Sequence, residues 1–206
     1  MTEPSAIWSS KLIVFDKSVS LTQNVILSHG RFALQALVSR IDRLYELIGA
    51  LPNLIDFYPH PDIPATLTDI AFQHGLASTI LFNDSPKGKS ESAAEYKCRA
   101  ERVTYVKAGC AHVLVDVLAD RKIRNSLTHI DEHLVKHLSQ PNTGWYIDSA
   151  IGRRDQFTAP NGLNIGFCRT YIASEDVLLH LGNEISIKRL RRQAKRVLSA
   201  IWKEPI

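Results

Sequence analysis

The sequence contains few cysteines, and their spacing forms no recognisable pattern. Its three cysteines, Cys98, Cys110 and Cys168, are an odd number, lie far apart and include no C-x-x-C pair. A disulfide framework needs paired cysteines and a thiolate zinc site needs closely spaced ones, so the sequence supports neither. We therefore expect a protein of a reducing compartment, the cytoplasm.

Long hydrophobic runs are also missing. No stretch approaches the run of about 18 apolar residues that a membrane-spanning helix requires. The first ten residues, MTEPSAIWSS, have an early acid and a proline where a secretory signal has positive charge followed by an apolar run. There is no internal repeat, and 206 residues suit one domain with a sizeable core. We expect a soluble protein with no membrane partner.

The net charge of +4 is small, but its distribution is uneven. The segment 188–206 has seven basic residues and one acid and so carries +6, which leaves −2 for the 187 residues before it. The basic residues of this segment are Lys188, Arg189, Arg191, Arg192, Lys195, Arg196 and Lys203. Such local basicity can contact phosphate without making the whole protein a polyanion binder.

Hydrophobic periodicity predicts two helices in the first part of the chain. Over 21–51 apolar residues recur at steps of three and four, with Gly30 at the one place where the stripe lacks a side chain. A connection with four prolines, LPNLIDFYPHPDIP, follows and breaks this helix. The second helix is predicted over 65–82.

Two more helices are predicted further along. Ser92 and Glu95 stand in the spacing of a capping box at the start of the third. Its apolar face is predicted to comprise Val103, Val106, Cys110, Val113 and Val117. The fourth lies in RKIRNSLTHIDEHLVKHL, residues 121–138, with the stripe Ile123, Leu127, Ile130, Leu134 and Leu138. Four helices with one apolar face each are most simply packed as a bundle.

The pattern changes after Pro141. Short β-branched and aromatic segments at 144–152, 163–173 and 176–187, separated by turn signals, predict a small antiparallel sheet or hairpins. A last helix follows, with the apolar stripe Ile187, Leu190, Ala194, Val197 and Ile201 and its basic side chains outward. We thus predict a helical bundle over 1–141, with β structure and a basic helix over 142–206 packed on it as one domain.

The hexapeptide R-N-S-L-T-H, residues 124–129, contains an arginine, an amide and a histidine that can act together. On one continuous helix, Arg124 and His129 are separated by about 140° around the axis and do not converge. If the helix starts near Asn125, Arg124 lies in the preceding turn and can fold toward His129. Asn125, four residues before His129, then shares its face. We predict this second arrangement.

These residue types suit chemistry at a phosphodiester. A guanidinium holds the non-bridging oxygens by two parallel hydrogen bonds, and an imidazole exchanges a proton near neutral pH. No metal is needed. RNA carries its nucleophile, the 2′-hydroxyl, beside the scissile phosphate, whereas DNA lacks it, so RNA is the favoured substrate.

Arg124-Asn125-x-x-x-His129, at the start of a late helix in a predicted four-helix bundle, resembles the R-polar-x-x-x-H signature of the HEPN superfamily (higher eukaryotes and prokaryotes nucleotide-binding domains). The resemblance implies a mainly α fold, a HEPN-like four-helix bundle to which this chain adds a small antiparallel β insertion and a C-terminal helix. It implies a homodimer that brings two such pairs into one cleft. It further implies metal-independent endoribonuclease activity in a toxin-antitoxin or other defence role, with an antitoxin or other protein as partner. Arg124 and His129 match the catalytic pair, and Asn125 matches the polar position.

A metal site is the first alternative for this stretch. His129, His133 and His137 follow one another at single turns, but the outer two are about 12 Å apart along a helix, so one ion cannot bind all three. The order H-E-x-x-H is absent. We expect a solvated histidine edge and no metal or other cofactor.

A nucleotide-binding P-loop is the second alternative. NDSPKGKS, residues 83–90, ends in G-K-S, but Asn83 stands where the first glycine of the motif belongs. The alternating strands and helices of such enzymes are also lacking. We interpret this stretch as a loop.

The basic last helix is the remaining candidate for nucleic-acid contact. Arg189, Arg191, Arg192, Lys195 and Arg196 can supply salt-sensitive, sequence-independent affinity for RNA. They can equally form a solvated face. The competing hypothesis for the whole chain is a non-catalytic dimeric interaction or RNA-binding module with the same fold.

Overall fold

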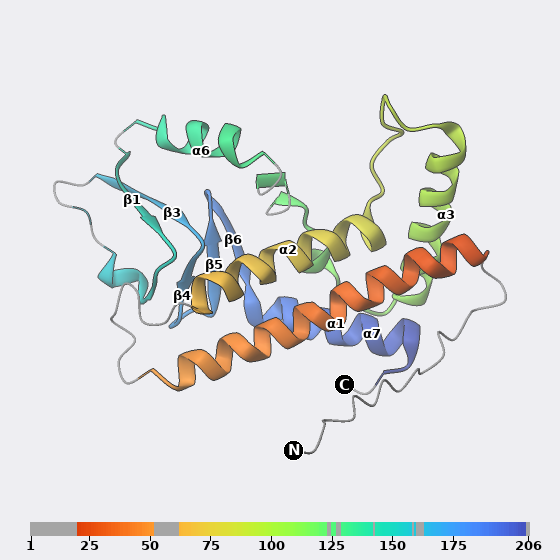
Figure 1. Ribbon diagram of the computed structural model, residues 1–206, viewed down its shortest axis with the longest axis horizontal. Coiled ribbons are helices and arrows are strands. Elements are labelled where there is room, and N and C mark those ends of the chain that lie inside the picture. Colours follow the sequence, from red (N-terminus) through yellow and green to blue (C-terminus); the bar gives the residue numbers. More distant parts are fainter. Residues whose placement is uncertain are drawn as a thin grey trace, which may run out of the picture.

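The protein is mainly helical with a small mixed sheet, as a computed structural model shows (Figure 1). It describes residues 20–51, 62–122, 125–126, 129–141, 143–157, 159 and 163–204. Its helices are α1 (Leu21–Gly49), α2 (Asp62–Phe82), α3 (Ala93–Gly109), α4 (Asp116–Ala119), α6 (Ile130–Leu138) and α7 (Ile187–Trp202). Its strands are β1 (Thr143–Asp148), β2 (Ile151–Gly152), β3 (Asn164–Cys168), β4 (Thr170–Ile172), β5 (Val177–His180) and β6 (Asn183–Ser186). In the part of the chain described, no helix combines the length and apolar character needed to cross a bilayer.

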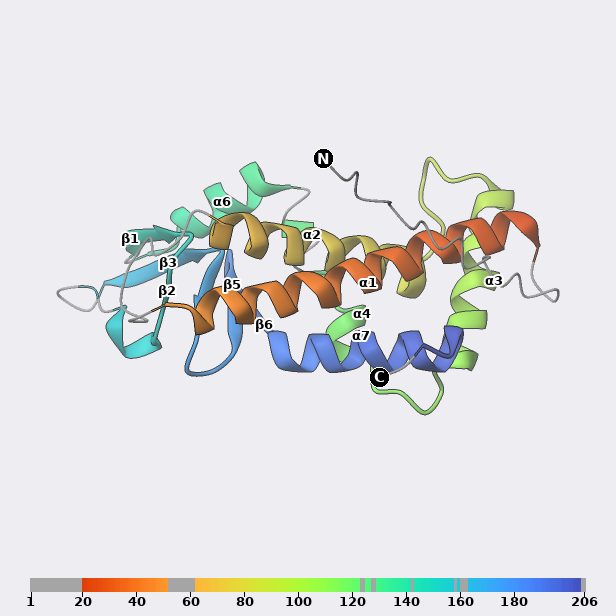
Figure 2. The same cartoon turned by 60° about the horizontal axis from the view of Figure 1, so that its bottom comes forward.

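The core lies between α1, α2 and α7. Helices α1 and α2 run antiparallel side by side, α7 packs along α1, and the strands gather at the end where α1 stops (Figures 1 and 2). The predicted stripes of α1 and α7 are buried, with Leu37, Ile41, Ile187 and Ala194 inaccessible to solvent. Helix α7, predicted as part of the segment 142–206, thus helps to form the helical core.

Helix α2 starts three residues before the predicted position, at Asp62. Pro64 lies in its first turn, where the absent N–H has no helical partner to lose. Gly30 sets the spacing between α1 and α2, because a Cβ at this position would lie 2.4 Å from Leu81 Cδ2. The gap in the α1 stripe is therefore filled by a leucine of the neighbouring helix.

The start of α3 is confirmed, but its predicted extension to Val117 is wrong. Ser92 and Glu95 form the capping box. The helix ends at Gly109, and a turn leads into the short α4. The reason is tertiary: the turn brings Leu118, which is fully buried, between α2 and α7.

Two buried polar side chains hold α4 in this position. His74 Nε2 of α2 donates toward the carbonyl oxygens of Val117 and Leu118, at 3.1 and 3.2 Å. Gln193 of α7 accepts from the Leu118 N–H at 2.9 Å and donates to Asp116 at 2.6 Å. Burial lowers the pKa of His74, so its imidazole is neutral.

The stretch 121–138 is not one continuous helix. Lys122 is already helical, so the helix does not start at Asn125, and the chain leaves helical geometry at His129 before α6 begins. Helix α6 is peripheral: Val135 and Leu138 are 66% and 45% exposed, and Leu134 of the predicted stripe is only half-buried. Ile123 and Leu127 lie outside the described residues. The HEPN-type four-helix bundle stays a prediction.

The strands occur where they are predicted, but they form a two-stranded sheet, β1–β3, and a four-stranded mixed sheet, β2–β4–β5–β6, so a purely antiparallel sheet is wrong. β1 pairs with β3 and β2 with β4 in parallel, whereas β4, β5 and β6 are antiparallel neighbours. The parallel strands β1 and β3 are connected by residues 149–163, which include β2 and the 3₁₀ turn Arg154–Gln156 and are long enough for a parallel crossover. β5 and β6 are joined by Leu181 and Gly182, both at positive φ (46° and 77°), as in a type I′ hairpin.

Candidate functional site

The predicted hexapeptide, residues 124–129, is described only in part. Arg124 lies outside the described residues, whereas Asn125 and His129 lie within them. The Asn125 carbonyl accepts from the His129 N–H at 3.1 Å, and the His129 carbonyl accepts from the His133 N–H at 2.9 Å. Asn125 and His129 are therefore one turn apart, which is the relation the sequence predicts.

His129 occupies the N-cap position of α6, with φ −120° and ψ 48°. Its side chain is 53% exposed, and its Nδ1 lies 3.9 Å from Glu132 Oε1. This contact is long and solvated, so it constrains the imidazole only weakly. An exposed imidazole at a helix start is accessible to a ligand.

A cavity of about 360 Å³ opens beside this segment, and we call it the α6 pocket. Its walls come from the end of the 121–126 segment, from α6 and from the β5–β6 turn. The lining residues are Lys122, Asn125, His133, Lys136, His137, Gln140, Leu181 and Asn183. Two ammonium groups, two imidazoles and three amides therefore surround one opening.

Sequence reasoning did not select Lys122, Lys136, His133 or His137 as functional residues. The one-turn spacing of His133 and His137 was the available signal, but it was interpreted as a solvated histidine edge, with a metal site as the alternative. Their shared cavity depends on the β5–β6 turn, which contributes Leu181 and Asn183 from more than forty residues away. No group of three or more residues suited to metal binding occurs among the described residues.

His137 fixes the distance between α6 and β3. A Cβ at Gly166 would lie 2.6 Å from His137 Nε2, so the ring packs directly on the backbone of the strand. This nitrogen is buried and has no hydrogen-bond partner among the described residues. His137 is therefore partly a packing residue of the α6 pocket, whereas Lys122 and Lys136 are exposed at it.

Another histidine, His180, belongs to the neighbouring strand β5. His180 is fully buried, and its Nδ1 lies 3.6 Å from Cys168 Sγ. Burial, together with the positive charge of Arg169, lowers the pKa of His180 to about 4. Arg169 is held by a two-point ion pair with Asp148. Both His180 and Cys168 are closed to solvent and serve the packing of the sheet.

The predicted RNA-binding residues of α7 do not share a surface with Asn125 and His129. Helices α6 and α7 lie on opposite sides of the α1–α2 pair in both views (Figures 1 and 2). Arg189 and Arg191 are engaged in ion pairs with Asp116 and Asp42, each at 2.5 Å. Arg192, Lys195 and Arg196 make no ion pair within the described part of the chain.

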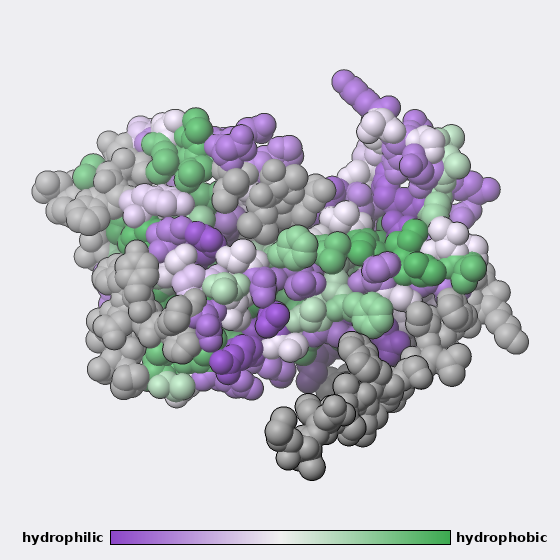
Figure 3. Space-filling model, in the orientation of Figure 1, coloured by the Kyte–Doolittle hydropathy of each residue, from purple (hydrophilic) through white to green (hydrophobic). Residues whose placement is uncertain are grey.

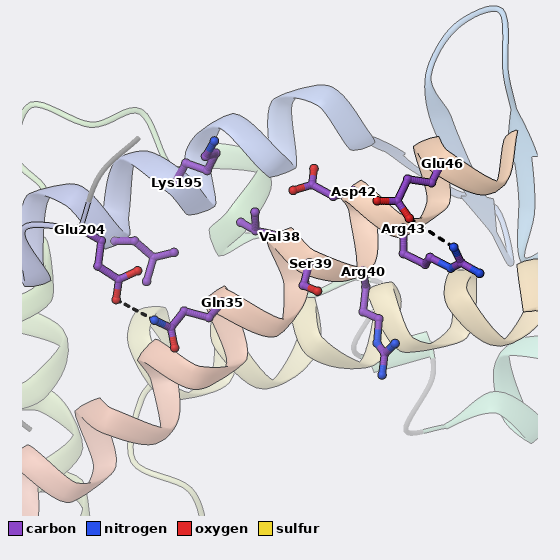
Figure 4. A pocket seen from close by; sticks show the side chains of 10 residues that line it. Gln35, Val38, Ser39, Arg40, Asp42, Arg43, Glu46, Lys195 and Glu204 are labelled. Atoms are coloured by element: carbon purple, nitrogen blue, oxygen red, sulfur yellow. Dashed lines mark hydrogen bonds and ion pairs between the residues drawn. The ribbon is translucent and has the colours of Figure 1, made fainter. Parts of the chain in front are cut away.

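Two cavities lie along α7. The larger, of about 800 Å³, is lined by α7 cations and by Tyr45, Tyr171 and Asp176. The other, of about 520 Å³, is a groove between α1 and α7 in which Lys195 lies across from Val38 (Figure 4). Its lining has three cations, Arg40, Arg43 and Lys195, and three anions, Asp42, Glu46 and Glu204, so it has no net charge. The groove therefore has no preference for ligands of one sign.

One exposed surface of the helical core is apolar, and we call it the α1–α2 face. Hydrophobic side chains gather over the middle of α2 and the first half of α1 (Figure 3). Its exposed large residues are Leu21, Val25, Phe32, Phe72 and Leu76. Such a patch on a protein surface is typical of contact with another protein.

Comparison of the chain with models of protein families, with curated proteins and with solved structures finds no match.

Proposed function

We propose that the segment 121–140 carries a metal-independent endoribonuclease site of HEPN type. The observation that supports it is the α6 pocket: Asn125, one turn before the exposed His129, opens on a cavity that also contains two lysines and two histidines. Cations and imidazoles around one opening are the groups that bind and cleave a phosphodiester. Arg124, by its resemblance to the family motif, is the guanidinium of the site.

The chemistry needs only groups of this kind. His129 removes the proton of the 2′-hydroxyl, and the 2′-oxygen forms a bond to phosphorus while the bond from phosphorus to the 5′-oxygen breaks. The leaving oxygen takes a proton from a neighbouring imidazole, and the products are a 2′,3′-cyclic phosphate and a 5′-hydroxyl end. Arg124 and the pocket lysines stabilise the negative charge that grows on the phosphate oxygens.

Cleavage of mixed RNA in EDTA tests the assignment. We expect wild-type protein to cleave, and Arg124→Ala and His129→Ala to lower the rate by about 100-fold or more, as removal of a general acid–base group does. His112→Ala, an exposed histidine in the turn after α3, is the matched control and should retain full activity. Equal cleavage by wild type and both site variants would remove the proposal.

The pocket lysines test where the RNA lies. Lys122→Ala with Lys136→Ala should raise KM and leave kcat nearly unchanged, since phosphate contacts away from the reacting atoms bind substrate and transition state alike. Lys87→Ala with Lys89→Ala removes the same charge from an exposed loop and is the control. An equal effect of both double variants would show that the α6 pocket does not bind the substrate.

The α1–α2 face favours a second candidate, a dimeric interaction module without catalysis. Burial of its five large apolar side chains against a second copy would stabilise a homodimer. Phe32→Ser with Phe72→Ser should convert a dimer into a monomer in sedimentation measurements, whereas Leu114→Ser, at a hydrophobic residue exposed elsewhere, should not. A wild-type protein that is monomeric at high micromolar concentration contradicts this candidate.

A further inference from the structure

The larger of the two α7 cavities, here called the α7 pocket, has one wall made of cations. Lys188, Arg191, Arg192, Lys195 and Arg196 follow at steps of three, one, three and one along α7, so they lie on one face of the helix. They extend over about 12 Å of helix axis. The pocket encloses about 800 Å³, within the range of sites that hold a small molecule.

Little of this positive charge is neutralised locally. Arg191 is paired with Asp42, but Lys188, Arg192, Lys195 and Arg196 make no ion pair among the described residues. Four unmatched cations that face one cavity repel each other, and a bound anion relieves that repulsion. The pocket therefore favours a ligand with more than one negative charge.

The rest of the lining of the α7 pocket adds a hydrogen-bond acceptor. Asp176 accepts from Tyr45 Oη at 2.9 Å and from Tyr171 Oη at 2.5 Å. These bonds come from α1 and β4 and fix the carboxylate at the edge of the pocket. Each carboxylate oxygen still has a second lone pair to offer to a donor.

This carboxylate makes the pocket unsuited to a bare polyphosphate. Asp176 repels phosphate oxygens but accepts hydrogen bonds from hydroxyl groups, and the partly exposed ring of Tyr45 supplies apolar surface beside it. A ligand that fits the whole lining carries both phosphates and hydroxyls. Sugar phosphates have this constitution.

We propose that the α7 pocket binds a small, multiply phosphorylated sugar. Its phosphates contact Arg192, Lys195 and the neighbouring α7 cations, and its hydroxyls donate to Asp176. The sugar is free, as in a sugar bisphosphate, or is the ribose of a nucleotide. The site is separate from the α6 pocket, because the α1–α2 pair lies between α6 and α7 (Figures 1 and 2). The inference therefore does not depend on the ribonuclease proposal.

Calorimetric titration of the full chain in EDTA tests this site with four probes: fructose 1,6-bisphosphate, ATP, inorganic tripolyphosphate and a short single-stranded RNA. We expect at least one of the two sugar-containing small molecules to bind at least tenfold more tightly than tripolyphosphate. Tighter binding of fructose 1,6-bisphosphate indicates a free sugar phosphate, and tighter binding of ATP indicates a nucleotide. Absence of binding by both, equal affinity for tripolyphosphate, or saturable binding of RNA alone overturns the proposal.

Variants locate the binding. Arg192→Ala with Lys195→Ala should lower the affinity for the more tightly bound probe at least tenfold. Lys87→Ala with Lys89→Ala removes equal charge from the 83–92 loop and should leave this affinity unchanged. Asp176→Asn should reduce the difference in affinity between that probe and tripolyphosphate. Loss of positive charge alone would weaken both probes and would not reduce this difference. If Asp176→Asn fails to fold, Tyr45→Phe, which releases one carboxylate oxygen, replaces it and should alter the same difference. Equal affinities of the α7 double variant and the loop control contradict the proposal.

Discussion

The helices of the α1–α2–α7 core and helix α6 have similar hydrophobic stripes in the sequence, but the side chains of these stripes are buried to different extents. Leu34, Leu37, Ile41 and Leu44 of α1 are inaccessible to solvent, because α2 and α7 cover two sides of that helix. Helix α6 packs through His137 on Gly166 of β3, outside the helical core. The described side chains of α6 are half-buried or exposed, and His133, Lys136 and His137 line the α6 pocket. A hydrophobic stripe thus predicts a helix, whereas the elements packed against that helix determine whether its side chains form core or line a site.

The largest expected effect compares two leucines in these helices. Leu37→Ala should lower the free energy of unfolding by about 3–5 kcal/mol, since it leaves a cavity in a fully buried position. Leu134→Ala in α6 should cost about 1 kcal/mol, since its side chain is only half-buried. Urea unfolding of both variants measures the difference. Equal costs would show that α6 belongs to the core.

The next effect concerns the close contact of α1 and α2. Gly30→Ala should destabilise the protein by about 1–3 kcal/mol, because the new methyl group would meet Leu81 inside the core. Gly49→Ala, at the last residue of the same helix, meets no atom within 4 Å and should be neutral or stabilising by up to about 1 kcal/mol. Thermal unfolding of the pair separates crowding from helix propensity. A stabilising Gly30→Ala would contradict the packing described.

A third effect depends on pH and concerns the sheet that supports α6. The pKa of His180 is lowered to about 4 in the folded state, so the folded state binds fewer protons than the unfolded chain. The contribution of His180 to the free energy of unfolding is therefore fully present above the ordinary histidine pKa of about 6.5. It is lost by roughly 1.4 kcal/mol per pH unit as the pH falls toward 4.

Urea unfolding between pH 7.5 and 4.5 measures this dependence. His180→Asn should reduce the slope relative to wild type, whereas His112→Asn, at an exposed histidine, should leave it unchanged. The two variants would show equal slopes if His180 were protonated in the folded protein.

Most helices of this chain could be predicted because each has a local signal. The stripe over 21–51, the capping box of Ser92 and Glu95 and the stripe from Ile187 all correspond to observed elements. The end of α3 could not be predicted, since it depends on buried contacts of Leu118 with His74 and Gln193. The direction of the strands also has no local signal, because parallel and antiparallel pairs use the same residue types.

The candidate site could be predicted only where its residues are close in sequence. Asn125 and His129 are related by one helical turn in the sequence and in the structure. Lys122, Lys136, His133 and His137 become lining residues of one cavity only when α6 meets the β5–β6 turn. The α7 pocket also requires Tyr45 of α1 and Tyr171 and Asp176 of the β4–β5 region, which are distant from α7 in the sequence or have no local signal, so the sequence predicted its cations without the rest of its lining.

The smallest expected effect is that of Arg189, a surface donor that shares Asp116 with Gln193, a donor in the core. Arg189 bonds this carboxylate from an exposed position, whereas Gln193 bonds it from a buried one and also accepts from the Leu118 N–H. Gln193→Ala should cost about 1–3 kcal/mol because it leaves the buried Leu118 N–H without its partner. Arg189→Ala should cost less than about 1 kcal/mol, since an exposed ion pair is weakened by solvent and salt. Chemical unfolding at low and high salt measures both costs. The cost of Arg189→Ala should decrease at high salt, whereas the cost of Gln193→Ala should not. If only the cost of Gln193→Ala decreased at high salt, surface charge would hold α4 to α7.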